Sequence, residues 1–378
     1  MPAPGIGTRY TMTGSNAFDP RYPIPATVHL ELLIPDLVPP YGDAAHGLAL
    51  PALERLLGRA LKQSGDATSL EDWVCRAAGL ADNPPVAAIS LLGDGGTPGA
   101  AGWVRADPVH LRYARDRFVV ETGPAATLTH DEAADLVATL NRHFAAEGLR
   151  FSAVNPRKWY VQTAAAPDVV LSPLDEAKGR SADAHAPTGP DAMAWQRFAN
   201  EAQMLFHEHP VNQAREARGE APINSVWFWG AGTLPATLSH AYTTIWSDDA
   251  TARGIALLGG AKAAPAPSTA SQLLASASGS GRELVVLEAL GKAAREEGLE
   301  VWRAKLMALD ADWFAPLLAA LKRDRIGMLS IHAISPQGSL SAETIRGDLM
   351  KFWRRTRPLA TYAPASSSSP SASSPSSA

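Results

Sequence analysis

The sequence has little of what export, disulfide bonding or membrane insertion requires. Its single cysteine, Cys75, excludes an internal disulfide bond and is typical of a reducing compartment, so we expect a cytoplasmic protein. No run of about 18 apolar residues, the length of a membrane-spanning helix, is present. Residues 1–22 also lack the basic and then apolar order of a secretion signal. We therefore expect no membrane partner.

Neither sign of charge is in large excess. The 34 Lys and Arg residues stand against 38 Asp and Glu, which gives a net charge of -4. Proteins that bind nucleic acid usually carry a basic face, and no helix-turn-helix pattern is evident here. We expect no nucleic-acid partner, and direct DNA binding is the least favoured function.

Apolar strands alternate with helices along the chain, which is the pattern of a mostly parallel α/β sheet. This pattern predicts strands at residues 28–34, 241–246, 283–290 and 326–332, and helices at 50–62, 249–258, 299–321 and 341–355. Further strands are predicted at 103–112, 118–121, 150–153, 158–163 and 224–229, and helices at 129–147 and 191–208. Thr129 and Glu132 form a capping box, and Gly148 is a helix stop.

The order of these elements predicts a discontinuous core domain interrupted by a second domain. The core comprises residues 28–95 and 236–359, and an inserted α+β domain comprises residues 100–232. Residues 1–27 are rich in Gly and Pro and are expected to be irregular. Residues 360–378 consist mostly of Ser, Pro and Ala, which cannot form a core, so this tail is expected to be disordered.

Residues 209–232 bring several ligand-binding residue types together in one short segment. His209, Asn212 and Arg215 supply an imidazole, an amide and a guanidinium, which are donors to anionic oxygens. An aromatic strand follows, and it leads to a Gly-Ala-Gly loop where the backbone can approach a ligand. A helix end, a turn and a core strand without any ligand would have the same composition.

This segment resembles the end of the inserted substrate domain in archaeal-type cofactor-independent phosphoglycerate mutases of the alkaline phosphatase superfamily. The matching positions are Pro210, Val211, Asn212, Arg215, Gly219, Pro222, Asn224, Gly230 and Gly232. The resemblance extends thinly from about residue 30 to residue 355 and implies an alkaline phosphatase-like fold with an inserted domain. It also implies phosphate-binding basic residues at Arg105 and near Lys158, although the residue pattern around Arg105 favours a surface charge on its strand.

The resemblance fails at the positions that hold two metal ions in that superfamily. Asp36 follows the first predicted strand, where the family has a metal-binding acid, but it also suits a turn or a cap. Where the family has further Asp and His ligands, this chain has Glu288 with no histidine after it, and His332 after an isoleucine. Residues 81–85, near the family's nucleophilic serine or threonine, contain no hydroxyl. We expect no metal and no cofactor, with Asp36, Glu288 and His332 as degenerate remnants of a catalytic site.

Two functions fit this sequence. The favoured one is a regulatory or phospho-metabolite-binding pseudoenzyme, similar to bacterial proteins named as regulators of pathogenicity factors in residues 103–110 and 227–230. A small anionic metabolite would bind between the domains without turnover. The ligand-binding residues would be Arg105, Lys158, His209, Asn212 and Arg215. The alternative is an active phosphoglycerate mutase or phosphohydrolase that holds Mn or Zn through unorthodox ligands. No protein partner is indicated.

A cluster of cations around Trp353 has two explanations. Its members are Lys351, Arg354, Arg355 and Arg357. They could meet an acidic partner or nucleic acid. We favour a structural role, because cations in the last turn of the predicted 341–355 helix would compensate the helix dipole.

Overall fold

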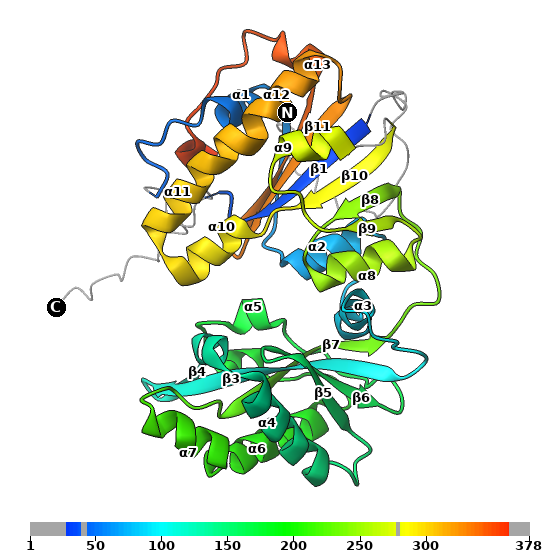
Figure 1. The fold of residues 1–378 in the computed structure, drawn as a ribbon, viewed down its shortest axis with the longest axis vertical. Coiled ribbons are helices and arrows are strands. Elements are labelled where there is room, and N and C mark those ends of the chain that lie inside the picture. The colour runs from blue at the N-terminus through cyan, green and yellow to red at the C-terminus, as the bar shows by residue number, and fades with distance from the viewer. Residues whose placement is uncertain (1–27, 39–43, 277–279, 363–378) are drawn as a thin grey trace, which may run out of the picture.

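A computed structural model describes residues 28–38, 44–276 and 280–362, which form two sheets with their own helices (Figure 1). The expectations for residues 1–27 and 363–378 lie outside the described residues. Residues 360–362, which we assigned to the disordered tail, belong instead to a 3-10 turn, Leu359–Tyr362. Leu359 is buried in the core, which anchors this turn. No helix within the described part of the chain is both long and apolar enough to cross a bilayer.

The larger sheet has seven strands in the order β2-β12-β11-β1-β10-β8-β9. They are β1 (Val28–Pro35), β2 (Leu61–Gly65), β8 (Tyr242–Trp246), β9 (Lys262–Ala264), β10 (Gly281–Val286), β11 (Met328–Ser335) and β12 (Gly338–Ile345). The strands from β11 to β9 are parallel, and β12 and β2 are antiparallel at one edge. The predicted mostly parallel α/β sheet is confirmed.

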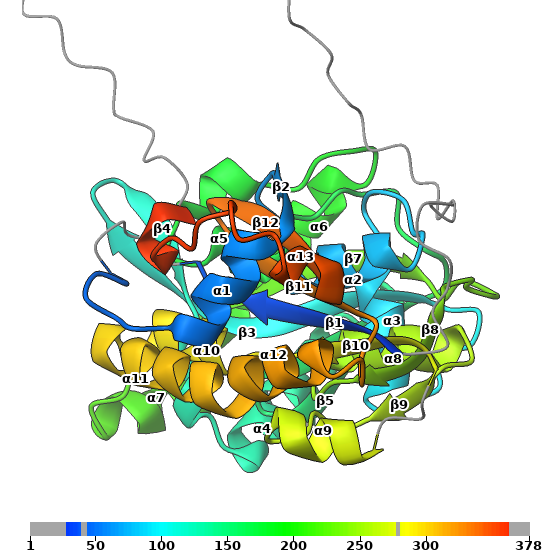
Figure 2. The same cartoon turned by 90° about the horizontal axis from the view of Figure 1, so that it is seen from above.

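Helices cover both faces of this sheet. One face carries Leu30 and Leu32 and packs against α1 (Pro51–Arg59), α9 (Ala270–Ser276), α10 (Ala289–Lys292), α11 (Leu299–Leu309), α12 (Ala315–Lys322) and α13 (Arg346–Leu349). From above, α9, α11 and α12 form a row beside β1 and β10 (Figure 2). The other face carries Leu33 and packs against α2 (Leu70–Ala77), α3 (Val86–Gly93) and α8 (Ala250–Leu258). Alternate residues of β1 face opposite sides, so a run of apolar residues serves both cores.

The start of α1 is capped by a residue distant in sequence. Its N-cap residue Leu50 has no side chain that can accept a hydrogen bond. The buried Asp310 accepts hydrogen bonds from the backbone N–H groups of Ala52 at 3.3 Å and Leu53 at 2.7 Å. Asp310 belongs to the π-helical turn Asp310–Phe314 between α11 and α12. Its carboxylate therefore ties α1 to that turn.

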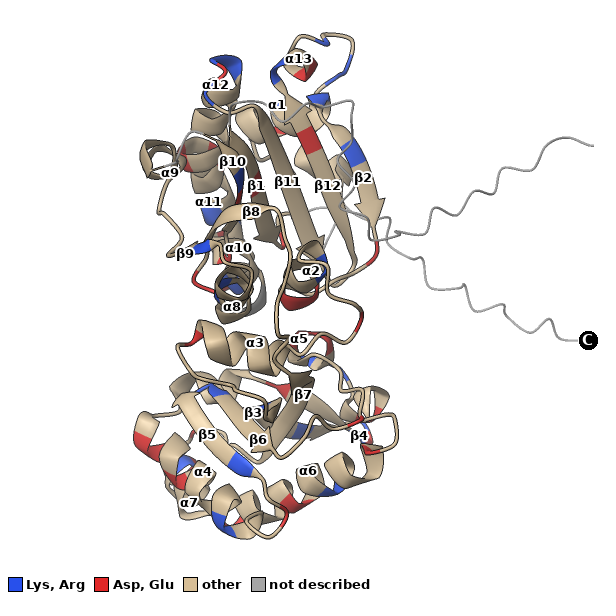
Figure 3. Ribbon diagram, turned by 90° about the vertical axis from the view of Figure 1, so that its right-hand side faces the viewer, with Lys and Arg blue, Asp and Glu red and all other residues tan. Residues whose placement is uncertain are grey.

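The second sheet is antiparallel and is built from the chain between the two halves of the larger one. Its strands are β3 (Gly102–Ala114), β4 (Arg117–Glu121), β5 (Arg150–Asn155), β6 (Lys158–Thr163) and β7 (Ser225–Thr233). The long strand β3 pairs with β4, β6 and β7, and β5 pairs with β6. On the face away from the larger sheet lie α4 (His130–His143), α6 (Ala192–His207) and α7 (Pro210–Ala217). On the near face lie α3 and α5 (Leu174–Ala177) (Figures 1 and 3).

The capping box predicted at the start of α4 is confirmed, but the predicted end of this helix at Gly148 was wrong, because α4 ends at His143. Thr129 and Glu132 form both hydrogen bonds of a capping box at the start of α4, at 3.0 and 3.2 Å. Gly148 has a φ of 72°, a left-handed conformation that glycine adopts without strain.

The two sheets meet where α3 packs against α8. A β-carbon on Gly93 would lie 1.8 Å from the carbonyl oxygen of Ala250, and one on Gly254 would lie 2.0 Å from that of Ile89. Both distances are far below any van der Waals contact. The helices therefore cross with their backbones touching, and each glycine is required by its neighbour.

Asp94, directly after α3, joins both sheets. Its buried carboxylate accepts hydrogen bonds from Lys158 at 3.1 Å and Tyr160 at 2.8 Å, both on β6. It also accepts one from Arg253 of α8 at 3.3 Å. One side chain thus links α3 to elements on either side of it.

Several predicted elements of the core differ in the structure. Residues 341–355 are not a helix, because β12 continues to Ile345 and helix α13 ends at Leu349. Leu340, Ala342 and Thr344 are buried while their neighbours are more exposed, which is the period of a strand. Consequently the strand expected at 326–332 is not the last one.

Two boundaries were also wrong. The strand expected at 283–290 ends at Val286, because the chain leaves the sheet and begins α10 at Ala289. The helix expected at 50–62 ends at Arg59, and Leu61 begins the edge strand β2 with 49% of its surface exposed.

Candidate functional site

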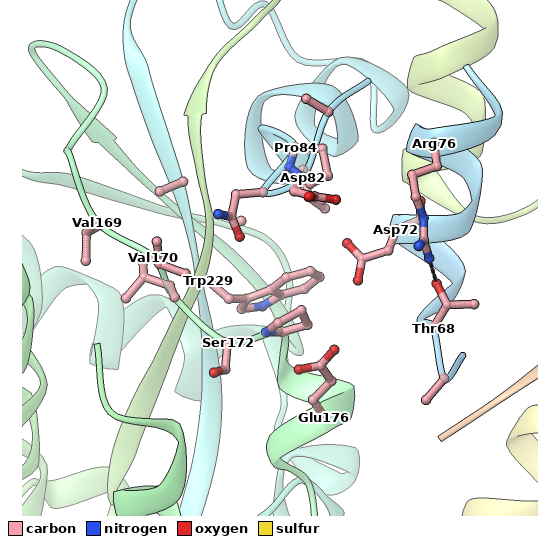
Figure 4. A pocket seen from close by; sticks show the side chains of 18 residues that line it. Thr68, Asp72, Arg76, Asp82, Pro84, Val169, Val170, Ser172, Glu176 and Trp229 are labelled. Carbon is pink, nitrogen blue, oxygen red and sulfur yellow. Dashed lines mark hydrogen bonds between the residues drawn. The ribbon is translucent and has the colours of Figure 1, made fainter. Parts of the chain in front are cut away.

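A pocket of about 300 Å³ opens between the two sheets. Its walls are α2, the loop before α3, residues 169–173 and the end of β7, and its polar and aromatic lining includes Thr68, Asp72, Arg76, Asp82, Glu176 and Trp229 (Figure 4). A second pocket of about 120 Å³ shares Thr68 and Glu176 and reaches Asp36 at the end of β1. We call the two pockets together the inter-sheet cleft. This position, beyond the carboxyl ends of parallel strands, is where α/β proteins commonly bind ligands.

Carboxylates outnumber cations along the cleft. The acidic lining residues are Asp36, Asp72, Asp82, Asp175 and Glu176, and the basic ones are Arg76 and Arg180. Asp72 and Glu176 point into the cavity from opposite walls, with Trp229 beside them (Figure 4). Burial raises the pKa of Glu176, and the charge of Asp72 raises it further. The cleft therefore favours protonation of its own acids or a compensating positive charge.

Glu71 adds a further acid next to the cleft. Burial raises its pKa to about 8, and the negative charges of Asp175 and Asp249 contribute to this shift. At neutral pH a large fraction of this carboxyl group is therefore protonated.

The hydroxyl of Thr68, just before α2, and the guanidinium of Arg76, in the last turn of α2, lie together on the cleft wall. Ser69 caps the helix by accepting a hydrogen bond from the Asp72 N–H at 3.0 Å. Arg76, one turn later, donates to the hydroxyl of Thr68. Among the described lining residues of the cleft there is no histidine or cysteine that could act as a base or a thiol nucleophile.

The loop before α3 faces the pocket with side chains that cannot act as a nucleophile of the expected type. Asp82, Asn83 and Pro84 line the pocket, and Pro85 is the N-cap residue of α3. No side-chain hydrogen bond caps this helix. The hydroxyl that the mutase resemblance implies in this segment is therefore absent from residues 81–85.

The three residues considered as metal-site remnants have different surroundings. Asp36 lies at the carboxyl edge of the sheet, in the left-handed backbone conformation (φ 55°), and lines the cleft. Glu288 is exposed and precedes α10. His332 lies within β11, where Nδ1 contacts Ser341 Oγ at 2.9 Å and the ring is 4.7 Å from that of Trp73.

A second group of charges explains the position of His332. Its Nε2 atom lies 3.6 Å from Glu31 Oε2, on the sheet face next to α2. Burial alone would raise the pKa of Glu31, but His332 and Arg282 lower it. Within the described residues, no three His, Cys, Asp or Glu side chains are grouped so that they could hold a metal ion. Asp36, Glu288 and His332 accordingly do not form such a group.

Arg105 lies behind the cleft wall. Its Nη2 donates to both oxygens of the buried Asp107 at 2.7 Å, and its guanidinium lies about 5 Å from the rings of Tyr160 (5.1 Å) and Trp229 (4.9 Å). Trp229 in turn donates its indole N–H to Asp107 at 2.8 Å. Burial would lower the pKa of Arg105, but the charge of Asp107 raises it. Lys158 is nearby on β6, paired with Asp94.

Arg215 lies on the other face of the antiparallel sheet, among α4 and α7. Its guanidinium is fully buried and contacts Glu132 at 3.2 Å and Glu220 at 3.3 Å. It also donates to Thr127 Oγ1 at 3.0 Å, and to the carbonyl oxygens of Pro124 and Ala221 at 2.9 and 3.1 Å. The two arginines expected to face one cleft thus lie on opposite faces of the sheet. The cause is that α7 packs its Arg215 side inward, onto the start of α4.

Asn212 and His209 also have partners within the protein. The buried Asn212 donates to the carbonyl oxygens of Phe206 and Ile223 and accepts from the Ile223 N–H, at 2.7 to 2.9 Å. His209 caps α7, and its Nε2 lies 2.9 Å from Thr139 Oγ1. These contacts hold the turn between α7 and β7. Whether any of these residues binds a ligand stays a prediction.

The sequence analysis did not single out the charged residues that line the cleft: Asp72, Arg76, Asp175, Glu176 and Arg180. One local pattern could have indicated Asp72. The order Ser69-Leu-Glu-Asp72 is typical of a helix start, with polar side chains in the first turn. Asp175 and Glu176 lie in the short helix α5, and Arg180 follows it. No local pattern indicates that this segment lines the same cleft as α2.

Comparison with known proteins gives no matching family model. The chain is 26% identical over 214 residues to the 2,3-bisphosphoglycerate-independent phosphoglycerate mutase of Methanosarcina mazei, which is 50% of this chain and 54% of that protein. It is 36% identical over 69 residues, 18% of each chain, to the enzyme of the same name from Methanothrix thermoacetophila. The match thus spans about half the length of the first relative.

A solved structure, that of the PH0037 protein from Pyrococcus horikoshii, superposes with a TM-score of 0.55 at 13% sequence identity. The superposition covers 88% of this chain and 92% of that one. The chain therefore shares its mixed α/β fold, with a mostly parallel sheet, with the PH0037 protein. The chain itself is a distant homologue of the 2,3-bisphosphoglycerate-independent phosphoglycerate mutases, and the resemblance drawn from its sequence is confirmed.

Proposed function

We propose that this protein is a phosphoglycerate mutase-like pseudoenzyme that binds a small phosphorylated or carboxylated metabolite and acts as a regulator. The observation that carries this proposal is the start of α3, where Asp82, Asn83 and Pro84 face the cleft and no hydroxyl is present. Covalent phosphoryl transfer of the kind that the resemblance implies needs an activated nucleophile at that position.

The positions of the acids and histidines support the same conclusion. Two-metal phosphoryl transfer requires two ions roughly 4 Å apart, held by convergent ligands. Glu288 is on the surface, and His332 is committed to Ser341 and the Glu31 group. Asp36 is the one of the three that lines the cleft.

The ligand would enter the inter-sheet cleft, where Arg76 and Arg180 supply the positive charge. Arg105 would act from behind Trp229 by fixing that ring against the ligand. The surrounding carboxylates oppose an anion, so binding should tighten as the pH falls and Glu176 and Glu71 take up protons. This pH dependence separates binding in the cleft from binding at surface arginines, whose charge does not change in this range.

Calorimetric titration with 3-phosphoglycerate at two pH values tests this binding. Arg76→Ala should weaken binding about ten- to a hundredfold, the worth of one charge-assisted hydrogen bond. Arg218→Ala, which removes an arginine with a 48% exposed side chain near α7, is the matched control and should leave binding unchanged. Equal affinity in the wild type and both variants, or no binding at either pH, would remove the ligand-binding part of the proposal.

Metal analysis and a coupled mutase assay test the loss of catalysis. We expect no stoichiometric Mn or Zn and no interconversion of 3- and 2-phosphoglycerate. Two tightly bound ions per chain, or turnover that a chelator abolishes, would overturn the proposal.

One observation favours the alternative, an active phosphohydrolase or mutase. The carboxylates of the cleft and the Thr68 hydroxyl line one cavity, and oxygen ligands suit Mn²⁺. If this alternative holds, added Mn²⁺ should produce phosphatase or mutase turnover that Thr68→Val and Asp72→Asn abolish. Turnover that survives both substitutions would assign the activity to a contaminant.

A further inference from the structure

A turn just after α13 exposes large apolar side chains at three of four consecutive positions. The exposed fractions are 75% for Met350, 81% for Phe352 and 66% for Trp353. The rings of Phe352 and Trp353 contact edge to face, with centroids 5.3 Å apart. Apolar side chains gathered on a surface and bordered by charge are typical of interaction sites, whereas single exposed apolar residues are not.

Cations border this turn on the end of the molecule farthest from the second sheet (Figure 3). They are Arg59, Lys62, Lys351, Arg354, Arg355 and Arg357. Burial lowers the pKa of Lys62, and the charges of Arg354 and Arg357 lower it further, so these cations lie close together. Two buried nitrogens of Arg59, Nε and Nη1, have no hydrogen-bond partner among the residues that the structure describes. Asp348 pairs with Lys351 at 2.6 Å and with Arg354 at 3.6 Å. The six cations outnumber this acid, although the whole chain has a net charge of -4.

The structural role that the sequence suggested for these cations is wrong. They cannot compensate the dipole of a helix that ends near residue 355, because α13 ends at Leu349. The turn is instead fixed against α1, where Arg354 Nη1 donates to the carbonyl oxygen of Arg59 at 2.6 Å. A β-carbon on Gly58 would lie 2.8 Å from Thr356 Cα, so the backbones are in contact. A fixed turn loses little conformational freedom on binding.

We propose that residues 350–357 form a docking surface for an acidic segment of another protein that also carries apolar side chains. Trp, Phe, Met and Arg are the residue types enriched in protein interfaces. Arginine predominates over lysine in the turn, and its planar fork binds a carboxylate through two parallel hydrogen bonds. This surface is separate from the inter-sheet cleft, so the proposal does not depend on a metabolite.

Two other anionic partners fit the geometry less well. Insertion into an anionic membrane usually uses an amphipathic helix, and α13 has only four residues. Single-stranded nucleic acid stacks its bases on open aromatic faces, whereas Phe352 and Trp353 lie at 81° to each other and are in mutual contact.

The test uses a fluorescein-labelled peptide of alternating glutamate and leucine, titrated with the full chain and followed by fluorescence anisotropy. The matched peptide replaces each glutamate with glutamine. We expect the acidic peptide to bind, and Trp353→Ala to weaken its binding at least about tenfold. Arg355→Ala should weaken binding and reduce its dependence on salt, because one ion pair is lost. Trp353→Phe should retain most of the affinity.

Tyr113→Ala is the control variant. Tyr113 is 64% exposed and also contacts a second ring, that of Phe118, but it lies on the antiparallel sheet. It should bind the acidic peptide like the wild type. Equal binding of the neutral peptide, an equal loss in Tyr113→Ala, or no binding would overturn the proposal. So would tighter binding to phosphatidylserine vesicles or to oligothymidylate than to the acidic peptide.

Discussion

Replacing Arg215 with alanine should destabilise the protein strongly, because its side chain is fully buried. The substitution leaves Glu132 and Glu220 without this cation, and leaves Thr127 and two carbonyl oxygens without a donor. Removing one partner of a buried ion pair costs about 3–5 kcal/mol, and we expect a loss in this range. Arg215→Lys keeps the charge but not the planar fork, so its loss should be intermediate.

Arg218 provides a control with the same acidic partners. It contacts Glu132 at 2.6 Å and Glu220 at 3.1 Å, but 48% of its side chain is exposed. Solvent screens such a pair, so Arg218→Ala should change the free energy of unfolding little. Both arginines contact the same two carboxylates, so the comparison separates a buried guanidinium with three further hydrogen bonds from an exposed one.

Urea unfolding followed by tryptophan fluorescence measures both variants, with the free energy taken from the midpoint and slope. Our structural assignment would be refuted if Arg215→Ala were as stable as Arg218→Ala. If Arg215→Ala were stable but had lost affinity for phosphoglycerates, the residue would be a ligand contact, as its sequence context suggested.

Three further substitutions test other parts of the structure. The pKa of Glu71 in the folded protein is about 8, above its ordinary value of 4.5. Between these pH values the folded state keeps a proton that the unfolded chain releases, so stability should fall as the pH rises. Glu71→Gln should remove most of this fall, which urea unfolding at pH 6 and pH 9 would detect as a flatter dependence. Asp310→Ala should cost about 1–3 kcal/mol by leaving two N–H groups of α1 without an acceptor, whereas Asp312→Ala, at an exposed position of the same turn, should cost little in the same assay. Gly254→Ala should lower the melting temperature through an overpacking cost of about 1–3 kcal/mol, while Gly123→Ala, with no atom within 4 Å of the added carbon, should not.

Elements with strong local signals could be predicted, and those that depend on distant partners could not. The start of α4 is marked by a capping box within its own sequence. Strand β12 was mistaken for a helix because its alternating residues are only weakly apolar, and their burial comes from β11 and β2. Local sequence therefore predicts an element whose stabilising contacts come from neighbouring residues, but not one that depends on distant strands.

The candidate site shows the same limit. The sequence identified Arg215 as a special residue, but its burial depends on Glu132, which lies 83 positions earlier in the chain. Arg76 and Glu176 line one cleft although they lie 100 positions apart in the chain. The residue types in the sequence indicated which side chains could bind a ligand. Which of these side chains lie close together depends on the fold.

The glycine contact between α3 and α8 has a consequence for how the cleft could respond to a ligand. Because backbone touches backbone at Gly93 and Gly254, α3 cannot move closer to α8, and it can only tilt about their crossing. The start of α3 lines the cleft, while Asp94 at its other end is bonded to Lys158 and Arg253. Asp94 directly follows Gly93, so a ligand that displaced the first turn of α3 would rotate the helix about the point that these two ion pairs hold. Ligand binding in the cleft would thus be transmitted to the junction of the two sheets by a rotation of the short helix α3.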